Sequence, residues 1–328
     1  MFTSLIEFKY VLPMAAGIAF FVCVLILPIL IPFLHKLKFG QSIRDDGPKW
    51  HQKKSGTPTM GGIAFIAAVI IAVLSTALSK GALLVLFTAV AFGAVGFIDD
   101  YIKVVQKRNL GLSAKQKFLL QLLVSVLFIY FGIKFDIVKS DICIPFMKNT
   151  VDIGMFIILL SVFIMTGFSN AVNLTDGLDG LAASVTAVCS VIIGIIAAMG
   201  KYYDIAIVCA AVFGACIGFL IFNFHPAKVF MGDTGSLFLG GFVSAAAIVM
   251  KMPIVLIVLG FVYVMETLSV MIQVAYFKKT GKRFFKMSPI HHHFEMCGWS
   301  EVKIVGVFTV VSIICGAIAV FMASFLLI

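Results

Sequence analysis

Acidic side chains stand at the ends of strongly apolar runs in this sequence, where a charge is costly. Asp99 and Asp100 follow directly after Phe97 and Ile98. Two adjacent carboxylates repel each other, so one pKa should rise unless a cation neutralises the pair. Lys103, one helical turn further on, could do this as a salt bridge, and a divalent metal held by oxygen ligands is the alternative.

Another acidic position, Asp233, lies in the segment NFHPAKVFMGDTGS, residues 223–236, which joins two apolar runs. Gly232 and Gly235 flank Asp233, so the backbone can turn tightly and approach another molecule there. The apolar run that follows is near the lower length limit for a membrane span, which places Asp233 at headgroup depth. A plain polar turn between two spans is the alternative interpretation.

Three oxygen-bearing side chains lie close together in the segment NLTDGLDG. Asn173, Asp176 and Asp179 fall at i, i+3 and i+6, so a helix would carry them on one face. Gly177 and Gly180 weaken a helix, so a turn around a ligand is equally compatible with the segment. In both cases we expect the three side chains to converge at membrane depth.

The segment SPIHHHFE carries three consecutive histidines, His291, His292 and His293. On a helix they would point about 100° apart, which suits metal chelation poorly. They are better placed as donors to phosphate oxygens or as acid/base groups, and a titratable surface patch is the alternative. Glu266 lies well inside an apolar run, where a carboxylate faces a groove, a partner or a proton path.

The polar segment from His35 to Gly62 ends in GTPTMGG. Its Gly, Pro and Thr residues indicate an irregular loop that re-enters the membrane at 57–62, with Lys53 and Lys54 just outside. Such a loop can offer backbone N–H and ammonium groups to a phosphate. The alternative is an ordinary basic flank of a membrane span.

The elements that must position these groups are apolar runs of about twenty residues, in a chain that is 62% hydrophobic and 12% charged. They predict an all-α, polytopic integral membrane protein. Because no repeat or linker interrupts the runs, we expect residues 1–328 to form a single transmembrane catalytic domain. The ten expected transmembrane helices lie near residues 11–34, 59–79, 81–98, 117–133, 153–172, 180–199, 203–222, 235–250, 253–276 and 303–327. The first run lacks the flanks of a signal peptide and is taken as a span.

Most of the 25 Lys and Arg residues fall in the segments that join odd to even spans. By the positive-inside rule that face is cytoplasmic, both termini lie outside, and the acidic positions form an active site on the cytoplasmic face. Much of the net charge of +10 follows from this topology, so no nucleic-acid partner is expected. The seven Cys residues are scattered without C-x-x-C spacing, which indicates neither a disulfide framework nor a zinc site.

Five motifs, GTPTMGG, FIDD, NLTDGLDG, NFHPAKVFMGDTGS and SPIHHHFE, occur in this order along the chain. Together, and over essentially the whole length, they closely resemble the phospho-N-acetylmuramoyl-pentapeptide transferases (translocase I) of the polyprenyl-phosphate sugar-1-phosphate transferase superfamily. The resemblance implies transfer of phospho-MurNAc-pentapeptide from UDP-MurNAc-pentapeptide to undecaprenyl phosphate, giving lipid I and UMP in peptidoglycan synthesis. It also implies Mg²⁺ as cofactor and a homodimer in the bacterial cytoplasmic membrane.

The same resemblance assigns roles to single residues. Asp99 would be the base on the lipid phosphate, Asp233 the metal ligand with Asp99 and Asp100 beside it, and Asp100 and Asp176 essential acids. His291 and His292 would be further catalytic groups. The remaining matching positions would surround the nucleotide and diphosphate: Lys54, Thr59, Lys103, Lys115, Asn173, Asp179, Asn223, Phe230, Gly232, Gln273 and His293.

Two other functions are compatible with parts of the pattern. Related transferases of other sugar phosphates share the acidic loops, and only the resemblance of SPIHHHFE favours the muramoyl-pentapeptide. An ion-coupled transporter would also carry intramembrane charge, but its site normally lies near the midplane between repeated halves, whereas these acids lie at one boundary. For the transferase, direct attack by the lipid phosphate and passage through an aspartyl phosphate are both compatible with the sequence.

Overall fold

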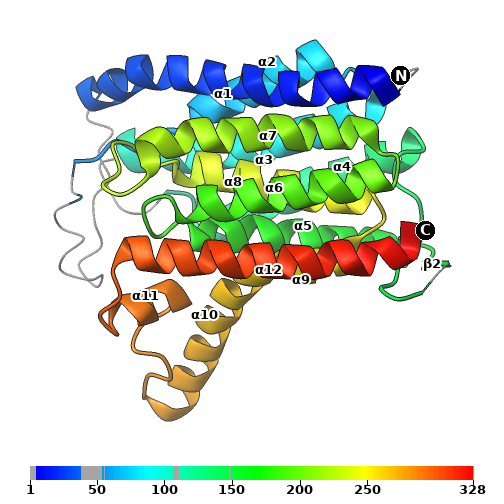
Figure 1. Ribbon diagram of the computed structural model, residues 1–328. Coiled ribbons are helices and arrows are strands. Elements are labelled where there is room, and N and C mark those ends of the chain that lie inside the picture. The colour runs from blue at the N-terminus through cyan, green and yellow to red at the C-terminus, as the bar shows by residue number, and fades with distance from the viewer. Residues whose placement is uncertain (1–4, 38–53, 55, 106–110, 148, 328) are drawn as a thin grey trace.

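The computed structural model describes residues 5–37, 54, 56–105, 111–147 and 149–327. Most of the polar loop expected between His35 and Gly62, Lys53 included, lies outside these ranges. Within them the chain is almost entirely helical, with long helices packed side by side (Figure 1). This confirms the all-α membrane class predicted from the apolar runs.

The elements follow one another in a simple order. The helices are α1 (Leu5–Lys36), α2 (Gly62–Thr76), α3 (Lys80–Val105), α4 (Ala114–Lys134), α5 (Phe156–Thr175), α6 (Leu181–Met199), α7 (Tyr203–Asn223), α8 (Gly232–Val249), α9 (Pro253–Leu259), α10 (Phe261–Thr280), α11 (Ile290–Glu295) and α12 (Glu301–Leu327). Two short antiparallel strands, β1 (Asp141–Cys143) and β2 (Thr150–Asp152), connect α4 to α5, with Asp141 opposite Asp152.

Among the described residues, eight helices are long and apolar enough to cross a membrane, and α9 with α10 would make nine if the bent pair counts as one span. The expected count of ten stays a prediction, for two reasons. The second expected span corresponds to α2, whose 15 residues fall short of the roughly twenty that a straight span needs. The ninth expected span is not one straight helix, because α9 and α10 meet at a bend of 81°.

The residue at the bend, Gly260, packs closely against α5. A Cβ at this position would lie 2.5 Å from the Phe168 ring of α5, so the backbone comes closer to α5 there than a larger residue would allow. Beyond the bend, α10 leaves the bundle and returns through α11 to the start of α12 (Figure 1). The exposed hydrophobic side chains of α10 include Leu268, Met271 and Phe277, which suits a helix surrounded by lipid.

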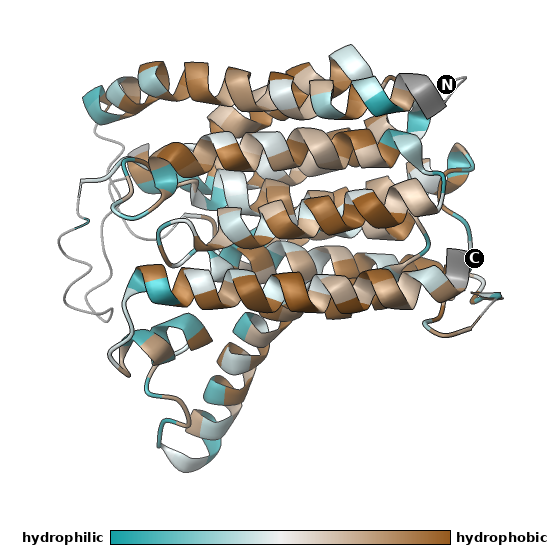
Figure 2. Ribbon diagram, in the orientation of Figure 1, coloured by the Kyte–Doolittle hydropathy of each residue, from teal (hydrophilic) through white to brown (hydrophobic). Residues whose placement is uncertain are grey.

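Hydrophobic residues cover most of the length of the bundle helices, and hydrophilic residues gather toward their ends and the connecting loops (Figure 2). Both termini lie at one end of the bundle, and α11 lies at the other (Figure 1). Which end faces the cytoplasm stays a prediction. The carboxylates that the sequence singles out lie at the end of the bundle that carries α11.

The central helix is α8, almost all of whose residues are buried. It packs most extensively against α3 and α5. Small residues make this possible, since a Cβ on Gly240 would press on the backbone of Ser169 and one on Gly241 on the Phe92 ring. The first turn of α8 carries Asp233, so the acidic side chain is fixed to the best-packed helix of the protein.

Candidate active site

Three carboxylates, Asp99, Asp100 and Asp233, form the carboxylate centre of the site. Each offers one oxygen, and these oxygens all lie within 4.8 Å of one another. Asp99 and Asp100 come from the last part of α3 and Asp233 from the first turn of α8. Gly96 allows the two helices to meet this closely, because a Cβ there would overlap the backbone of Asp233. Residues 133 positions apart thus share one centre.

Asp100 holds the first turn of α8. Its Oδ2 accepts hydrogen bonds from the backbone N–H of Thr234 at 2.9 Å and from the Thr234 hydroxyl at 2.7 Å, and its Oδ1 accepts one from the backbone N–H of Asp233 at 3.2 Å. A carboxylate that accepts from the unpaired N–H groups of a helix start stabilises that start. Gly232, at φ 72°, has no Cβ that would overlap the Asp100 carboxylate. Asp100 therefore fixes where Asp233 points.

Two lysines balance the carboxylate centre. The Nζ of Lys103 lies 2.5 Å from Asp99, 2.8 Å from Asp233 and 3.8 Å from Asp100. The Nζ of Lys117 lies 2.8 Å from the same Asp233 oxygen. The salt bridge that the sequence offered as one alternative is present, and three carboxylates against two ammonium groups leave a formal charge of about −1 at the centre.

Lys117 is a site residue that the sequence reasoning missed. The sequence offers it only as one of the Lys and Arg residues that indicate the topology, whereas the resemblance places Lys115, two residues earlier, beside the substrate. On a helix, two positions turn the side chain by about 200°, so the two lysines face nearly opposite ways. The structure places Lys115 on the exposed side of α4 and brings Lys117 to Asp233. The two lysines differ only in the direction in which their side chains leave the axis of α4.

Asn173 completes the first contacts of Asp233. From the last turn of α5, its Nδ2 donates to Asp233 Oδ1 at 2.7 Å and to the Ser236 hydroxyl at 2.8 Å. Asp233 thus has an amide donor on one oxygen and two ammonium groups on the other. Its side chain has little freedom left.

Asp176 lies immediately after α5 and caps its end, with φ −79° and ψ 46°. Its burial and the nearby negative charges of Asp233, Asp100 and Asp179 hold the pKa of its carboxyl well above the usual range. The helix that would have aligned it with Asn173 and Asp179 ends at Thr175. The three side chains therefore do not share one helix face as expected. Gly177 and Gly180 let the chain turn away after the helix ends.

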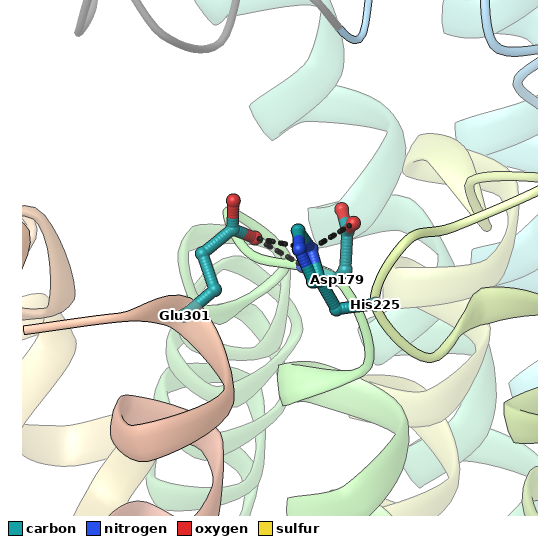
Figure 3. A group of neighbouring side chains, drawn as sticks. All are labelled: Asp179, His225 and Glu301. Atoms are coloured by element: carbon teal, nitrogen blue, oxygen red, sulfur yellow. Dashed lines mark hydrogen bonds and ion pairs between the residues drawn. The ribbon is translucent and has the colours of Figure 1, made fainter.

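Asp179 belongs to a separate group, the Asp179 cluster, formed with Lys54, His225 and Glu301. Figure 3 shows the two carboxylates on either side of the His225 ring. Lys54 Nζ lies 2.7 Å from Asp179 and 2.6 Å from Glu301, and His225 Nδ1 lies 3.0 Å from Asp179. The backbone N–H of Ala227 also donates to Asp179, at 3.0 Å. These contacts tie the loops before α2, α6 and α8 to the first residue of α12.

Glu301 was not singled out from the sequence. The available signal was its place as an acid at the start of the last apolar run, on the same expected face as the other acids. Asp179, His225 and Glu301 have ligand atoms close enough for a metal ion, within 4.8 Å of one another. The ammonium of Lys54 bonds both carboxylates, so a cation already balances the cluster.

Three further predicted positions hold the loop before α8. Asn223 accepts the Gly180 N–H at 3.1 Å and donates to the Val229 carbonyl at 2.8 Å. The backbone of Phe230 donates to Pro58 and accepts from Gly61, each at 2.8 Å. Through this pairing Thr59 lies against Gly232, where its Oγ1 would be 2.8 Å from an added Cβ. The motif GTPTMGG thus supports the loop that carries Asp233.

Gln273 and His293 lie in the connection between α10 and α11. Gln273 Oε1 accepts the backbone N–H groups of Phe284 and Phe285 at 3.1 and 2.9 Å. His293 Nδ1 accepts the Lys286 N–H at 3.2 Å. Both side chains shape this connection, and none of their hydrogen bonds among the described residues reaches the carboxylate centre.

The other two histidines each face a different acid. His291 is buried, and its Nδ1 lies 3.0 Å from Glu266 Oε2. His292 Nδ1 lies 2.6 Å from Glu295 Oε2. The three histidines thus have different hydrogen-bond partners, although the rings of His291 and His292 are in contact, with centroids 4.1 Å apart. The structure does not bring them together on one ion.

The chain matches known families over most of its length. Residues 82–251 match the model of glycosyl transferase family 4, and residues 54–66 match phospho-N-acetylmuramoyl-pentapeptide-transferase signature 1. The chain is 51% identical over 310 residues to the phospho-N-acetylmuramoyl-pentapeptide-transferase of Halalkalibacterium halodurans, covering 93% of this chain and 95% of the relative. It is 50% identical over 322 residues to the enzyme of that name from Listeria innocua, covering 96% and 99%.

These matches include the carboxylate centre, the Asn173 to Asp179 turn and the loop that begins at Lys54. Sequence identity of this extent, over nearly the full length of both chains, indicates shared ancestry of the whole protein and not of one motif alone. The spans and the relatives together make it a multi-pass protein of the bacterial inner membrane. The chain belongs to the phospho-N-acetylmuramoyl-pentapeptide-transferase family.

Proposed function

We propose that this protein transfers phospho-MurNAc-pentapeptide from UDP-MurNAc-pentapeptide to undecaprenyl phosphate, giving lipid I and UMP. The observation that carries the proposal is the carboxylate centre, with Lys103 and Lys117 on Asp233. Phosphoryl transfer depends on charge neutralisation and in-line placement of the reacting groups more than on covalent help from the protein. A rigid centre of acids and ammonium groups provides both.

The location of the centre suits the two substrates. A polyprenyl phosphate keeps its tail in hydrocarbon and its phosphate at headgroup depth, where we expect the end of α3 and the start of α8. The nucleotide sugar arrives from the aqueous side, which we take to be the cytoplasm. An open groove of 510 Å³, lined by His35, Thr57 and Lys228 among others, adjoins the Asp179 cluster through Ala227 and has the size of a small-molecule site.

The reaction balances with direct attack. An oxygen of the lipid phosphate forms a bond to the sugar-side phosphorus of the nucleotide sugar, the bond from that phosphorus to the bridging oxygen breaks, and UMP leaves with this oxygen. Asp99 orients the attacking phosphate or takes its proton. The ammonium groups of Lys103 and Lys117 offset the charge on the phosphates.

A divalent cation fits the donors of the centre. Carboxylate oxygens are the ligands that Mg²⁺ prefers, and the formal charge of the centre remains negative after both lysines are counted. Asp233 and Asp99 would hold the ion in place of an ammonium group of Lys103 or Lys117, whereas the partners of Asp100 are groups of the first turn of α8 itself. Bound Mg²⁺ would supply positive charge to the diphosphate.

The test is release of UMP by the purified protein from UDP-MurNAc-pentapeptide, with and without undecaprenyl phosphate and Mg²⁺. We expect release only when all components are present, loss of release in EDTA, and loss in the Asp233→Asn variant with its folding retained. Full rates in EDTA would contradict the metal requirement. Equal rates with UDP-N-acetylglucosamine would point instead to another sugar-1-phosphate transferase.

Two finer points need separate measurements. Direct attack requires both substrates before any bond breaks, so lipid-free enzyme should show no burst of UMP. A burst with a phosphosugar left on an aspartate would establish the two-step route. The proposed homodimer is tested by the mass of the detergent-solubilised protein from light scattering, with a monomer mass as the contrary result.

A further inference from the structure

A carboxylate and an imidazole meet in the interior beside the bend of the ninth expected span. Glu266 of α10 and His291 of α11 are both fully buried, and their Oε2 and Nδ1 atoms lie 3.0 Å apart. A contact between a carboxylate oxygen and Nδ1 places a hydrogen on Nδ1. It fixes both the orientation of the imidazole and the nitrogen that remains for other partners.

The other nitrogen of His291 has no protein partner among the described residues. Nε2 is buried without a hydrogen bond, which is costly for a polar atom. It points at Gly177, since a Cβ at that position would overlap Nε2. Gly177 directly follows Asp176 and lies four residues after Asn173, whose Nδ2 donates to Asp233 Oδ1 at 2.7 Å. The unpaired nitrogen thus faces the turn beside the carboxylate centre.

We infer that Glu266 is a positioning residue of the reaction, which holds His291 so that Nε2 stays against the Asp176–Gly177 turn and meets the substrate when that turn moves aside. The inference rests on the proposed function. With its hydrogen on Nδ1, His291 offers Nε2 as an acceptor for a hydroxyl, an amide or a protonated phosphate oxygen of the nucleotide sugar. Glu266 acts only through His291.

A purely structural role accounts poorly for this pair. Burial of a carboxylate and an imidazole costs more than packing two apolar side chains of the same size, so stability alone does not favour the pair. Glu266 Oε1 and His291 Nε2 both stay without protein hydrogen bonds, whereas a structural pair would have its polar atoms satisfied. Gly177 leaves the imidazole the space that a side chain would fill.

A double-mutant cycle tests the inference. Glu266→Leu and His291→Ala should each lower kcat by about 10- to 100-fold, the usual cost of losing an outer hydrogen-bond partner. If Glu266 acts through His291, the double variant should be no slower than His291→Ala alone. Glu266→Gln should recover most of the activity lost in Glu266→Leu, because its carbonyl oxygen can still accept from Nδ1–H.

Lys117 provides the control, because it contacts Asp233 and has no contact with Glu266 or His291 among the described residues. The losses in Glu266→Leu and Lys117→Met should therefore multiply. Gly177→Ala should lower kcat as His291→Ala does, by displacing the imidazole while leaving Glu266 in place. The kcat values are compared only among variants whose thermal stability in detergent equals that of the wild type. Each kcat is measured at a saturating concentration of the lipid acceptor.

The outcomes separate this inference from the proposed function. If the wild-type protein releases no UMP, the proposed function fails. If the wild type is active and the losses in Glu266→Leu and His291→Ala multiply, or if Glu266→Gln is as slow as Glu266→Leu, then Glu266 does not act by orienting His291. Non-multiplying losses together with rescue by glutamine establish the positioning role.

Discussion

Asp100 accepts both the backbone N–H and the hydroxyl of Thr234, at 2.9 and 2.7 Å, across 134 residues of chain. Helix caps are usually supplied by the residue just before the helix, but here another helix supplies the acceptor. The resemblance suggested that Asp100 is an essential acid. Its hydrogen bonds give a physical reason for that importance that needs no proton transfer, because Asp233 depends on this turn for its direction.

Asp100→Asn should therefore lower both stability and turnover. Loss of the charged acceptor at a helix start costs about 1 kcal/mol, and the first turn of α8 should loosen. Thr234→Val is the matched variant, since it keeps the shape and removes only the hydroxyl. We expect it to show a smaller loss of both quantities in thermal unfolding and UMP release. If Asp100→Asn abolished turnover without any change in stability, a direct chemical role would be favoured.

Lys117 and Lys115 provide a contrast within one helical turn. Lys117→Met should lower kcat by about 100-fold, comparable with the loss of one donor to a developing charge. Lys115→Met should have a much weaker effect that appears in KM, because this lysine is exposed and does not contact the carboxylate centre. UMP release at several nucleotide-sugar concentrations measures both. Equal losses in kcat would show that substrate binding draws Lys115 into the centre.

The comparison of these lysines shows where sequence reasoning ends. The helical class and the position of the acidic residues at one end of the bundle were predictable, because both follow from where the apolar runs begin and end in the sequence. The partner of each acid depends on helix phase and on close contacts such as Gly96 against Asp233, which involve residues far apart in the chain. Glu301 joined Asp179 for the same reason, since no local pattern relates the start of α12 to the turn before α6.

An amide pair joins α4 to α5, with Gln121 buried and Asn170 half-buried. Asn170 Nδ2 donates to Gln121 Oε1 at 2.7 Å, and Gln121 Nε2 donates back to Asn170 Oδ1 at 3.3 Å. Gln121 lies one turn after Lys117, and Asn170 one turn before Asn173. Both of these neighbours contact Asp233, so the amide pair aligns two of its partners.

Asn170→Leu should destabilise the protein by about 1–3 kcal/mol, because it leaves the buried Gln121 amide unpaired. Gln121→Leu should cost less, because Asn170 Nδ2 keeps its hydrogen bond to the Thr166 carbonyl. The double variant should regain much of that stability, since both polar groups are then removed. Its turnover should stay low if the pair aligns the lysine and asparagine on Asp233. Thermal unfolding and UMP release on the four proteins measure this, and a double variant with full turnover would show that packing alone sets the register.

The raised pKa of Asp176 predicts an unusual dependence of stability on pH. Burial, the largest cause, and the charges of Asp233, Asp100 and Asp179 keep this carboxyl protonated in the folded state at pH values where it is ionised in the unfolded state. The folded protein then binds more protons than the unfolded protein. The free energy of unfolding must therefore fall as pH rises through the folded pKa, and the contribution of Asp176 is fully present only below the unfolded pKa of about 4.

Asp176→Asn should abolish this slope. Near pH 7 and above, the substrate-free variant should be at least as stable as the wild type, although its turnover is expected to be lost.

Asp152→Asn is a control of opposite sign at the other end of the bundle. The Gly154 N–H, which bonds Asp152 at 2.9 Å, lowers the pKa of that carboxyl. Its contribution is fully present at neutral pH and is lost only as pH falls through the folded pKa, so Asp152→Asn should lower stability by a constant amount from pH 6 to pH 9, without a slope. Thermal unfolding in detergent from pH 6 to pH 9 compares the three proteins. Parallel curves for the wild type and Asp176→Asn would mean that lysines or bound cations already neutralise the turn, and that Asp176 enters the reaction ionised.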